Sequence, residues 1–373
     1  MILLQYFSLK KAIFIALYPL SLLYGFITWI RNRMYDSGIL KPFVFDKTKV
    51  ISIGNLCAGG SGKTPMTDYI VQLLKNETKI AVLSRGYKRK TDGFVLADNT
   101  STSEQIGDEP MLIHVKHPNI EVAVDSNRKR GIEILEKLNH PPEAVVLDDA
   151  FQHRSVKPGM SILLTEYSNL YINDFMLPSG RLREFKEGAI RADVIVVTKT
   201  PQHATGIEIR TVIKDIKPLP YQQLFFSYIN YGKLYQIFNP RNQLVSEHEL
   251  YKYSVLLVTG IASNKDILTY VKEYANEVKP LAYSDHVDYS AEHVQQIKNE
   301  YSSLHGEFKI IITTEKDAVK FNSEKLKSLL EGFPIYVLPI EIDFKSKKEE
   351  FNELIIKYVR TNKIYHAKYS ARN

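Results

Sequence analysis

The chain has 373 residues, of which 44% are hydrophobic and 24% are charged. This length and composition predict folded structure in two domains and exclude disorder of the whole chain. The single cysteine, Cys57, excludes an intramolecular disulfide and any metal site built on two cysteines. The net charge of +7 favours an anionic partner, and nucleotide, nucleic acid and anionic lipid all satisfy it.

The first segment, residues 1–48, predicts membrane association. An uncharged and largely apolar stretch, residues 12–30, lies between basic residues. As a helix this stretch would be about 28 Å long, close to the thickness of a bilayer core. Pro19 and several hydroxyl residues make it a poor spanning segment, and Trp29 suits contact with lipid headgroups. A helix lying in the membrane interface is therefore favoured over one that spans the bilayer or packs inside the protein.

Residues 49–220 are expected to form the core domain, because short apolar runs alternate there with helical periodicity. Strands are predicted at 50–53, 80–83, 122–124, 144–147, 162–164 and 194–197, and helices at 64–74, 109–115, 128–138 and 184–191. Buried runs that alternate with helices predict an α/β fold with a mainly parallel sheet between layers of helices.

Residues 221–345 are expected to form a smaller C-terminal α/β domain, joined to the core by a two-stranded linker. The linker strands are predicted at 222–228 and 233–238, either as a hairpin or as two separate linker strands. The later elements are strands at 255–259, 309–313 and 334–338 and helices at 264–274 and 291–301. Residues 346–373 are expected to hold a final helix, 347–359, and a polar, disordered tail from about residue 363.

A glycine-rich loop between the first predicted strand and the first helix of the core predicts a phosphate-binding site. The loop consists of Cys57, Ala58, Gly59, Gly60, Ser61, Gly62, Lys63 and Thr64. Its glycines let backbone N–H groups turn inward around phosphate oxygens, and the N-terminus of the following helix adds positive potential. Lys63 can reach the β- and γ-phosphates of a nucleoside triphosphate, and the Thr64 hydroxyl can bind Mg²⁺. The loop therefore predicts a P-loop NTPase-like core, although Cys57 stands where the usual pattern begins with glycine.

Two carboxylates follow the strand predicted at 144–147. Asp148 and Asp149 stand at its C-terminal end, and a nucleoside triphosphatase holds its Mg²⁺ with a carboxylate at the tip of a strand that neighbours the phosphate loop. We therefore expect Asp148 to share a magnesium ion with Thr64, and Asp149 to lie beside it.

Several phrases in the sequence together resemble the tetraacyldisaccharide 4′-kinase family. They are GNL at 54–56, SRGYKR at 84–89, GDEP at 107–110, LDDAFQHR at 147–154, LPSGRLRE at 177–184, DH at 285–286 and TTEKD at 313–317. The resemblance covers nearly the whole chain, and the order and spacing of so many phrases make it specific.

The resemblance implies a reaction and a location. The γ-phosphate of ATP would pass to the 4′-hydroxyl of a tetraacyl glucosamine disaccharide 1-phosphate, with Mg²⁺ as cofactor and no nucleic acid as partner. The enzyme would be a peripheral or monotopic protein on the cytoplasmic face of the bacterial inner membrane.

The resemblance also implies site residues. The catalytic and binding positions of the family that match this chain are Lys63, Thr64, Asp148, Asp149, Gln152, His153, Arg183, Glu184 and His286. In the family, the histidine matched by His286 pairs with an aspartate that activates the sugar hydroxyl. Some relatives place that aspartate where this chain has Asn127, so Asp125 and Asp149 both remain candidates for the general base.

Two other functions are compatible with the phosphate loop. The first is a membrane-associated ATPase or GTPase that acts as a switch or an assembly factor. Such proteins often carry a lysine before the paired glycines, where this chain has Ala58, and the run 198–201 lacks the aspartate of a guanine-binding motif. The second is a nucleic-acid-binding NTPase, suggested only by the net charge, because the basic residues are spread along the chain.

Overall fold

The computed structural model describes residues 2–238 and 247–361, which form two compact units. The first unit contains the chain up to Arg85, Ala123–Ile229, and the chain from Ile342 onward. The second contains Gly86–Val122 and Asn230–Glu341. Residues 86–122, which the sequence placed in the core domain, thus group with the second unit. The tail predicted from residue 363 lies outside the described residues.

The first unit is built on a sheet whose strands follow the order β14–β8–β7–β6–β1–β5–β2–β4–β3. The central strand β1 pairs in parallel with β5 and with β6, and β7 pairs in parallel with β6 and with β8. The strands are β1 (Lys49–Asn55), β2 (Ile80–Ser84), β4 (Glu121–Val124), β5 (Ala144–Leu147), β6 (Met160–Glu166), β7 (Val194–Thr198), β8 (Gln223–Tyr231) and β14 (Ile340–Phe344). The central strands are buried along their length, as expected for a parallel sheet covered on both faces.

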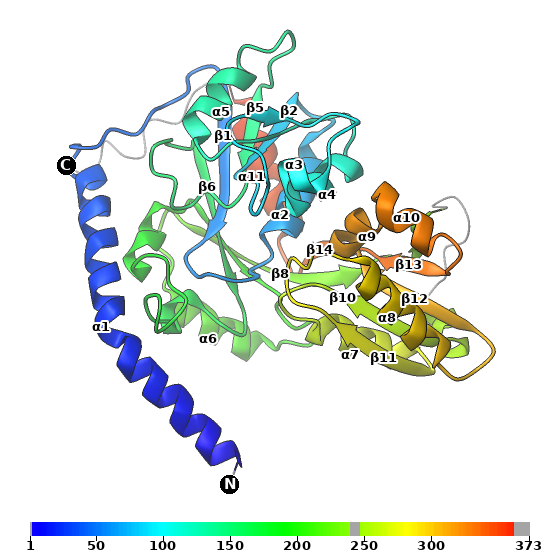
Figure 1. Ribbon diagram of the computed structural model, residues 1–373. Helices are drawn as coiled ribbons and strands as arrows, with labels where there is room; N and C mark the ends of the chain where they lie inside the picture. The colour runs from blue at the N-terminus through cyan, green and yellow to red at the C-terminus, as the bar shows by residue number, and fades with distance from the viewer. Residues whose placement is uncertain (1, 239–246, 362–373) are drawn as a thin grey trace. The chain divides into compact units, whose positions relative to one another are not determined.

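Helices in the first unit include α1 (Ile2–Asp36), α2 (Lys63–Leu74), α5 (Arg128–Leu135), α6 (Gly206–Ile216) and α11 (Lys348–Arg360). The helix predicted at 184–191 is a 3₁₀ helix, Lys186–Arg191, after a short 3₁₀ turn at Tyr171–Asn173. The sequence analysis missed α6, although Thr205 and Glu208 form a capping box at its start. In Figure 1, α1 is the long blue helix and α11 is the red one beside β1 and α2.

The second unit is a smaller α/β domain, as predicted, with a sheet in the order β11–β10–β12–β13–β9. Its strands are β9 (Tyr235–Gln236), β10 (Ser254–Thr259), β11 (Glu277–Ala282), β12 (Lys309–Thr314) and β13 (Ile335–Leu338), with the short β3 (Val95–Leu96) in its other segment. Its helices are α3 (Ser103–Ile106), α4 (Asp108–Lys116), α7 (Lys265–Tyr274), α8 (Ala291–Ser302), α9 (Glu315–Phe321) and α10 (Glu324–Leu330), and a 3₁₀ helix spans Glu247–Lys252.

The two-stranded linker is not a hairpin. Strand β8 pairs in parallel with β7 of the first sheet, whereas β9 pairs antiparallel with β13 of the second. The predicted strands exist, but each finds its hydrogen-bond partners in a different sheet. The apolar runs around Asn230 and Gly232 resembled a hairpin because a strand's partners are not visible in its own residues.

Helix α1 is attached to the first unit by polar contacts along one side. The Tyr24 hydroxyl donates to the carbonyl oxygen of Arg183 at 2.9 Å. The Arg31 guanidinium donates to the carbonyl oxygen of Gln152 at 2.8 Å, and the Asn32 amide donates to the Glu184 carboxylate at 2.8 Å. These bonds connect the N-terminal helix to two of the segments that carry predicted site residues.

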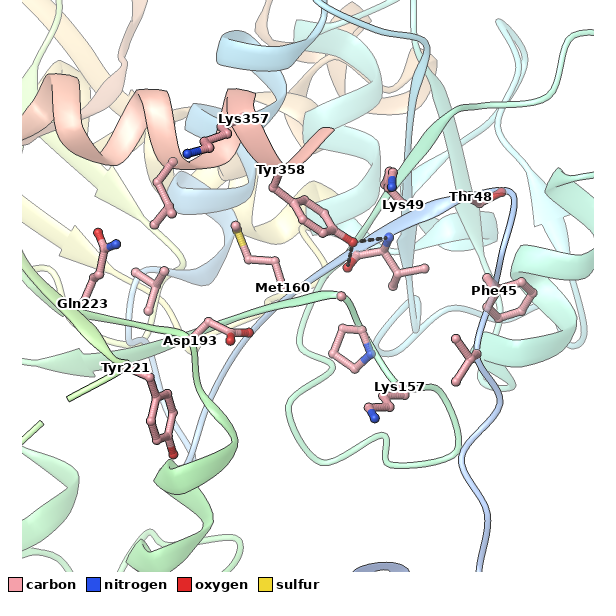
Figure 2. Close-up of a pocket in the computed structure, with 16 residues that line it drawn as sticks. Phe45, Thr48, Lys49, Lys157, Met160, Asp193, Tyr221, Gln223, Lys357 and Tyr358 are labelled. Carbon is pink, nitrogen blue, oxygen red and sulfur yellow. Dashed lines mark hydrogen bonds between the residues drawn. The ribbon is translucent and has the colours of Figure 1, made fainter. Parts of the chain in front are cut away.

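Helix α11 is fixed to the central strand by one side chain, which Figure 2 shows reaching from α11 to β1. The Tyr358 hydroxyl donates to the carbonyl oxygen of Val50 and accepts from its N–H, each at 3.1 Å. Gly159 leaves room for this contact, because a Cβ there would lie 2.2 Å from the hydroxyl oxygen.

Candidate active site

The phosphate loop connects β1 to α2, where the sequence predicted it. Gly62 precedes α2 with a φ of 82°, in the left-handed region that side chains rarely adopt. The Thr198 hydroxyl supports the loop from β7 by donating to the carbonyl oxygen of Ser61 at 2.9 Å. The Lys63 ammonium lies 3.4 Å from the carbonyl oxygen of Gly59, so the lysine folds back over its own loop.

A second backbone segment runs beside the start of this loop and brings an arginine to it. The Arg183 N–H donates to the carbonyl oxygen of Leu56 at 2.8 Å, and the Ala58 N–H donates to that of Arg181 at 2.6 Å. The Arg183 guanidinium then contacts both carboxylate oxygens of Asp149, at 2.8 and 3.0 Å. The predicted site residues of the loop at 58–63, Asp149 and Arg183 therefore lie close together.

Asp149 lies between two cations. Its carboxylate is 3.8 Å from the Lys63 ammonium in addition to its contacts with Arg183. Burial alone would raise the pKa of Asp149, but the positive charges of Lys63 and Arg183 outweigh it and hold the pKa below its usual value. The carboxylate is therefore ionised at neutral pH. The backbone of Asp149 has a φ of 46°, in the left-handed region.

Asp148 and Thr64 supply the oxygen atoms expected of a magnesium site. The buried Asp148 carboxylate accepts a hydrogen bond from the Thr67 hydroxyl of α2 at 3.0 Å. The Thr64 hydroxyl makes no hydrogen bond to any residue in the described part of the chain. Hydroxyl and carboxylate oxygens are ligands that Mg²⁺ prefers. Within residues 2–238 and 247–361 no group of three or more His, Cys, Asp or Glu is placed to hold a metal ion.

Asp125 and Asn127 lie directly before α5. The fully buried Asp125 carboxylate accepts two hydrogen bonds from the Arg130 guanidinium, both at 2.8 Å, and one from the Asn127 N–H at 2.8 Å. The Asn127 side chain caps α5 by accepting from the Arg130 N–H at 3.1 Å. Both side chains are thus engaged in local structure, which does not favour Asp125 as a general base.

His286 pairs with an aspartate, but the partner is one to which the sequence analysis gave no role. Its Nδ1 lies 3.0 Å from Oδ2 of Asp108, the first residue of α4, within the second unit. The Lys320 ammonium contacts the same oxygen at 2.8 Å. Burial opposes ionisation of Asp108, but hydrogen bonds from His286 and Lys320 hold its pKa below the usual value. The sequence signal for Asp108 was the GDEP phrase. In the structure, Gly107 of this phrase has a φ of 94° directly before the helix.

Gln152 and Glu184 connect the loop after β5 to the segment that bears Arg183. The Gln152 amide donates to the carbonyl oxygen of Asn55 at 2.8 Å and to the Glu184 carboxylate at 3.1 Å. The buried Glu184 also accepts from Arg191 at 2.7 Å. These two residues matched the family pattern, and their contacts brace the strand end that precedes the phosphate loop.

His153 is kept neutral. Burial is the largest cause and the positive charges of Arg128, Arg85 and Arg31 add to it, so the pKa of His153 falls to about 4. Cys57 is also neutral, because burial and the nearby Asp174 raise the pKa of its thiol to about 11. Cys57 is therefore a small wall residue of the loop rather than a nucleophile.

The pKa of His153 predicts a pH dependence of stability. An unfolded histidine titrates near pH 6.5, so the unfolded chain binds a proton that the folded chain refuses until about pH 4. The free energy of unfolding should therefore fall as the pH drops from about 6.5 to about 4, by at most about 3 kcal/mol from this residue. Urea unfolding of the protein and of His153→Gln at pH 7 and pH 4.5 measures it. The variant should lose less stability over this interval, and equal losses would contradict the expectation.

Two cavities in the first unit differ in their relation to the loop. A hollow of about 20 Å³ adjoins the loop, and the buried Ser61 hydroxyl that lines it has no partner in the described part of the chain. A cavity of about 200 Å³ lies near the amino ends of β1, β6 and β7, with Lys49, Met160 and Tyr358 around it (Figure 2). Because β1 runs for about 20 Å from this cavity to the loop, the larger cavity is separate from the phosphate site.

Comparison with known proteins adds to this geometry. The model of the tetraacyldisaccharide-1-P 4′-kinase family matches residues 13–360. The chain is 46% identical to the tetraacyldisaccharide 4′-kinase of Bacteroides thetaiotaomicron, covering 93% of each chain. It is 43% identical to that of Flavobacterium johnsoniae, covering 93% of this chain and 97% of the relative.

A solved structure shows the same fold. The crystal structure of LpxK from Aquifex aeolicus in complex with ATP is similar with a TM-score of 0.72 and 30% sequence identity. The match covers 93% of this chain and 99% of that one. The likeness confirms the predicted α/β fold with its large, mainly parallel sheet.

Proposed function

The chain belongs to the tetraacyldisaccharide 4′-kinase family, and from this premise we propose which residues perform its reaction. It is an ATP-dependent kinase of lipid A biosynthesis. The reaction moves the γ-phosphate of ATP to the 4′-hydroxyl of a tetraacyldisaccharide 1-phosphate. Two sets of side chains supply the chemistry.

The observation that carries the proposal is the position of Lys63 and Arg183 around Asp149 at the phosphate loop. Phosphoryl transfer depends on positioning and on charge stabilisation more than on covalent catalysis. Lys63 neutralises oxygens of the β- and γ-phosphates, and the loop N–H groups bind the other phosphate oxygens of ATP. Arg183 is close enough to the same place to stabilise the phosphoryl group in transit, and Asp149 keeps both cations directed to the loop.

Thr64 and Asp148 are the proposed protein ligands of Mg²⁺. Their oxygens and the absence of a complete protein-only metal cluster within the described residues fit an ion shared with ATP. When bound, Mg²⁺ supplies positive charge that offsets the charge on the phosphate oxygens. Thr67 holds the Asp148 carboxylate toward α2, which keeps its oxygen at the start of that helix.

Asp108 is the proposed acceptor of the proton from the 4′-hydroxyl. Its Oδ2 takes two donors, His286 and Lys320, while Oδ1 makes no hydrogen bond to any residue between 2 and 238 or 247 and 361. The low pKa of Asp108 keeps the carboxylate ionised and ready to accept a proton. His286 orients the carboxylate through Nδ1 and is a positioning residue.

Helix α1 is the proposed membrane contact. Between Phe14 and Asp36 it is long and apolar enough to cross a bilayer by length and composition. Its large exposed side chains include Ile15, Leu20, Leu22, Leu23, Phe26, Ile27, Trp29 and Ile30. Because the opposite side of the helix binds the first unit, we propose a peripheral or monotopic enzyme on the cytoplasmic face of the inner membrane, with no nucleic acid partner.

The membrane proposal predicts that two negative charges added to helix α1 weaken membrane binding. The variant Leu23→Glu/Phe26→Glu should move most of the protein from the membrane fraction to the soluble fraction, because both side chains are more than half exposed. Flotation with lipid vesicles measures this partition. The control is Gln72→Glu/Asn76→Glu, which adds the same charge at exposed positions of the first unit. Equal partition of the two variants would contradict the proposal. Deleting residues 1–34 is a poorer test, because it also removes the contacts of Tyr24 and Arg31.

Labelling the product tests the function directly. Purified protein is incubated with γ-labelled ATP, Mg²⁺ and an acylated disaccharide 1-phosphate, and the position of the label is determined. Label on the 4′-oxygen is expected. Hydrolysis of ATP that does not require the acceptor and leaves it unlabelled would instead support the nucleotide switch considered above.

A further inference from the structure

We propose that Lys316 is a positioning residue of the kinase, which keeps Nε2 of His286 unprotonated so that a neutral His286 holds Asp108 as an acceptor. The proposal rests on the role of Asp108 and His286 given above. It adds a third member to that pair, from the TTEKD phrase, for which the sequence analysis gave no role.

The argument begins with the atoms around His286. Its Nε2 lies 3.0 Å from the Lys316 ammonium, and its Nδ1 lies 3.0 Å from Oδ2 of Asp108. An ammonium only donates hydrogen bonds, so Nε2 must accept. In a neutral imidazole the other nitrogen then carries the hydrogen. Nδ1–H therefore donates to Asp108, and the three residues form a chain of hydrogen bonds with one direction.

Lys316 is held in place by its helix. It is the second residue of α9, which begins where the Thr314 side chain accepts a hydrogen bond from the N–H of Asp317. The buried Asp317 carboxylate accepts from the Gly260 N–H at 2.9 Å and from the Tyr289 hydroxyl at 3.0 Å. Asp317 thereby ties α9 to the end of β10 and fixes the point from which Lys316 extends.

The surroundings of His286 contain further charges. Lys316 also lies 3.2 Å from Asp285 Oδ1 and 3.9 Å from Glu109 Oε1. The groups that face His286 or its partners are Tyr87, Asp108, Glu109, Asp285, Lys316 and Lys320. The side chain of Lys316 is only 16% exposed, so the ammonium is a fixed donor rather than a mobile surface charge.

Removing the ammonium changes what the ring can do. The Nδ1–H bond to Asp108 remains, because an ionised carboxylate only accepts. Without its donor, however, Nε2 is able to bind a proton, and the Asp285 carboxylate 3.8 Å away favours the charged ring. A positively charged ring beside Asp108 makes that carboxylate a weaker acceptor of the substrate proton.

Nitrogen NMR of the whole protein labelled at histidine reads the tautomer without substrate. In the unaltered protein at pH 7 we expect His286 to carry its proton on Nδ1, with Nε2 unprotonated. Lys316→Met should give protonated Nε2, and Lys316→Arg should restore the original state, because arginine also only donates. Lys272→Met, at an exposed position of α7 in the same unit, is the control. A proton on Nε2 in the unaltered protein, or no change in Lys316→Met, would overturn the proposal.

Kinetic measurements link the protonation of His286 to the reaction. Lys316→Met should lower kcat by about tenfold or more, part of the contribution of general base catalysis, with KM for ATP unchanged and kcat recovered in Lys316→Arg. A normal kcat in a Lys316→Met protein that carries a proton on Nε2 would show that His286 does not position the base. Failure of the proposed function itself is distinguishable, because the NMR result needs no phosphoryl transfer.

Discussion

Lys63→Ala is expected to lower kcat for phosphoryl transfer by about 10²–10³-fold, the loss typical of one preorganised electrostatic contact. The lysine side chain reaches back over the phosphate loop and lies near Asp149, where it stabilises charge that increases in the transition state. No other cation replaces it from the same helix, because the first turn of α2 from Lys63 to Met66 contains no second basic residue.

The variant should remain folded. Lys63 contributes one long contact to a carbonyl oxygen and one to a carboxylate, and neither is part of the buried core. Lys75→Ala, at the exposed C-terminal end of α2, is the matched control for loss of a lysine. Circular dichroism and thermal unfolding should be alike for both, while only Lys63→Ala loses turnover. Full turnover in Lys63→Ala would remove the phosphate loop from the mechanism.

Asp108→Asn is expected to lower kcat by about 10²–10⁴-fold, the range of a general base. Asparagine keeps the shape of the side chain but accepts protons poorly, so positioning by His286 and Lys320 cannot compensate. The low pKa of Asp108 also predicts that kcat shows no loss attributable to this carboxylate at any pH above about 5. Steady-state kinetics from pH 5 to pH 8 measure both effects.

The variant Asp125→Asn tests whether Asp125 or Asp108 is the general base. Its carboxylate bonds Arg130 and the Asn127 N–H, so losing the charge should cost about 1.5–3 kcal/mol of folding free energy. The folded variant should turn over at a rate within a few fold of the unaltered protein. A greater loss of kcat in folded Asp125→Asn than in Asp108→Asn would restore Asp125 as a candidate for the general base. Asn127→Asp provides a further check and should leave kcat nearly unchanged, because this side chain caps α5.

The phosphate loop was predictable because its requirements are local. A strand, a glycine-rich turn and a helix start are consecutive in the chain, and Gly62 must adopt a left-handed conformation whatever its distant neighbours are. Asp148 and Asp149 were also predictable. They directly follow a strand, and parallel strands bring their carboxyl ends to one edge of the sheet.

The partner of His286 was not predictable in this way. Asp125 follows a strand and is as plausible as any strand-end carboxylate until its bonds with Arg130 are seen. Asp108 begins a helix and reaches His286 from 178 positions earlier in the chain. Strand β8 presents the same limit, because its pairing with β7 rather than β9 depends on residues elsewhere. Local patterns identified the helices, the strands and the phosphate loop. Hydrogen bonds between distant segments determined which side chains and which strands pair.

The order of the segments along the chain has a consequence for synthesis. The chain leaves the first unit after Arg85 and again after Ile229, and β14 and α11 are the last described elements to join it. The bond between Val50 and Tyr358 spans 308 positions. At about 5–20 residues per second, a ribosome needs about 15–60 s to add that length. During this interval every described segment of the second unit has emerged, while the first sheet still lacks an edge strand and a covering helix. The part of the enzyme that begins first is therefore completed last, and its exposed strands must be protected from aggregation until Tyr358 has emerged.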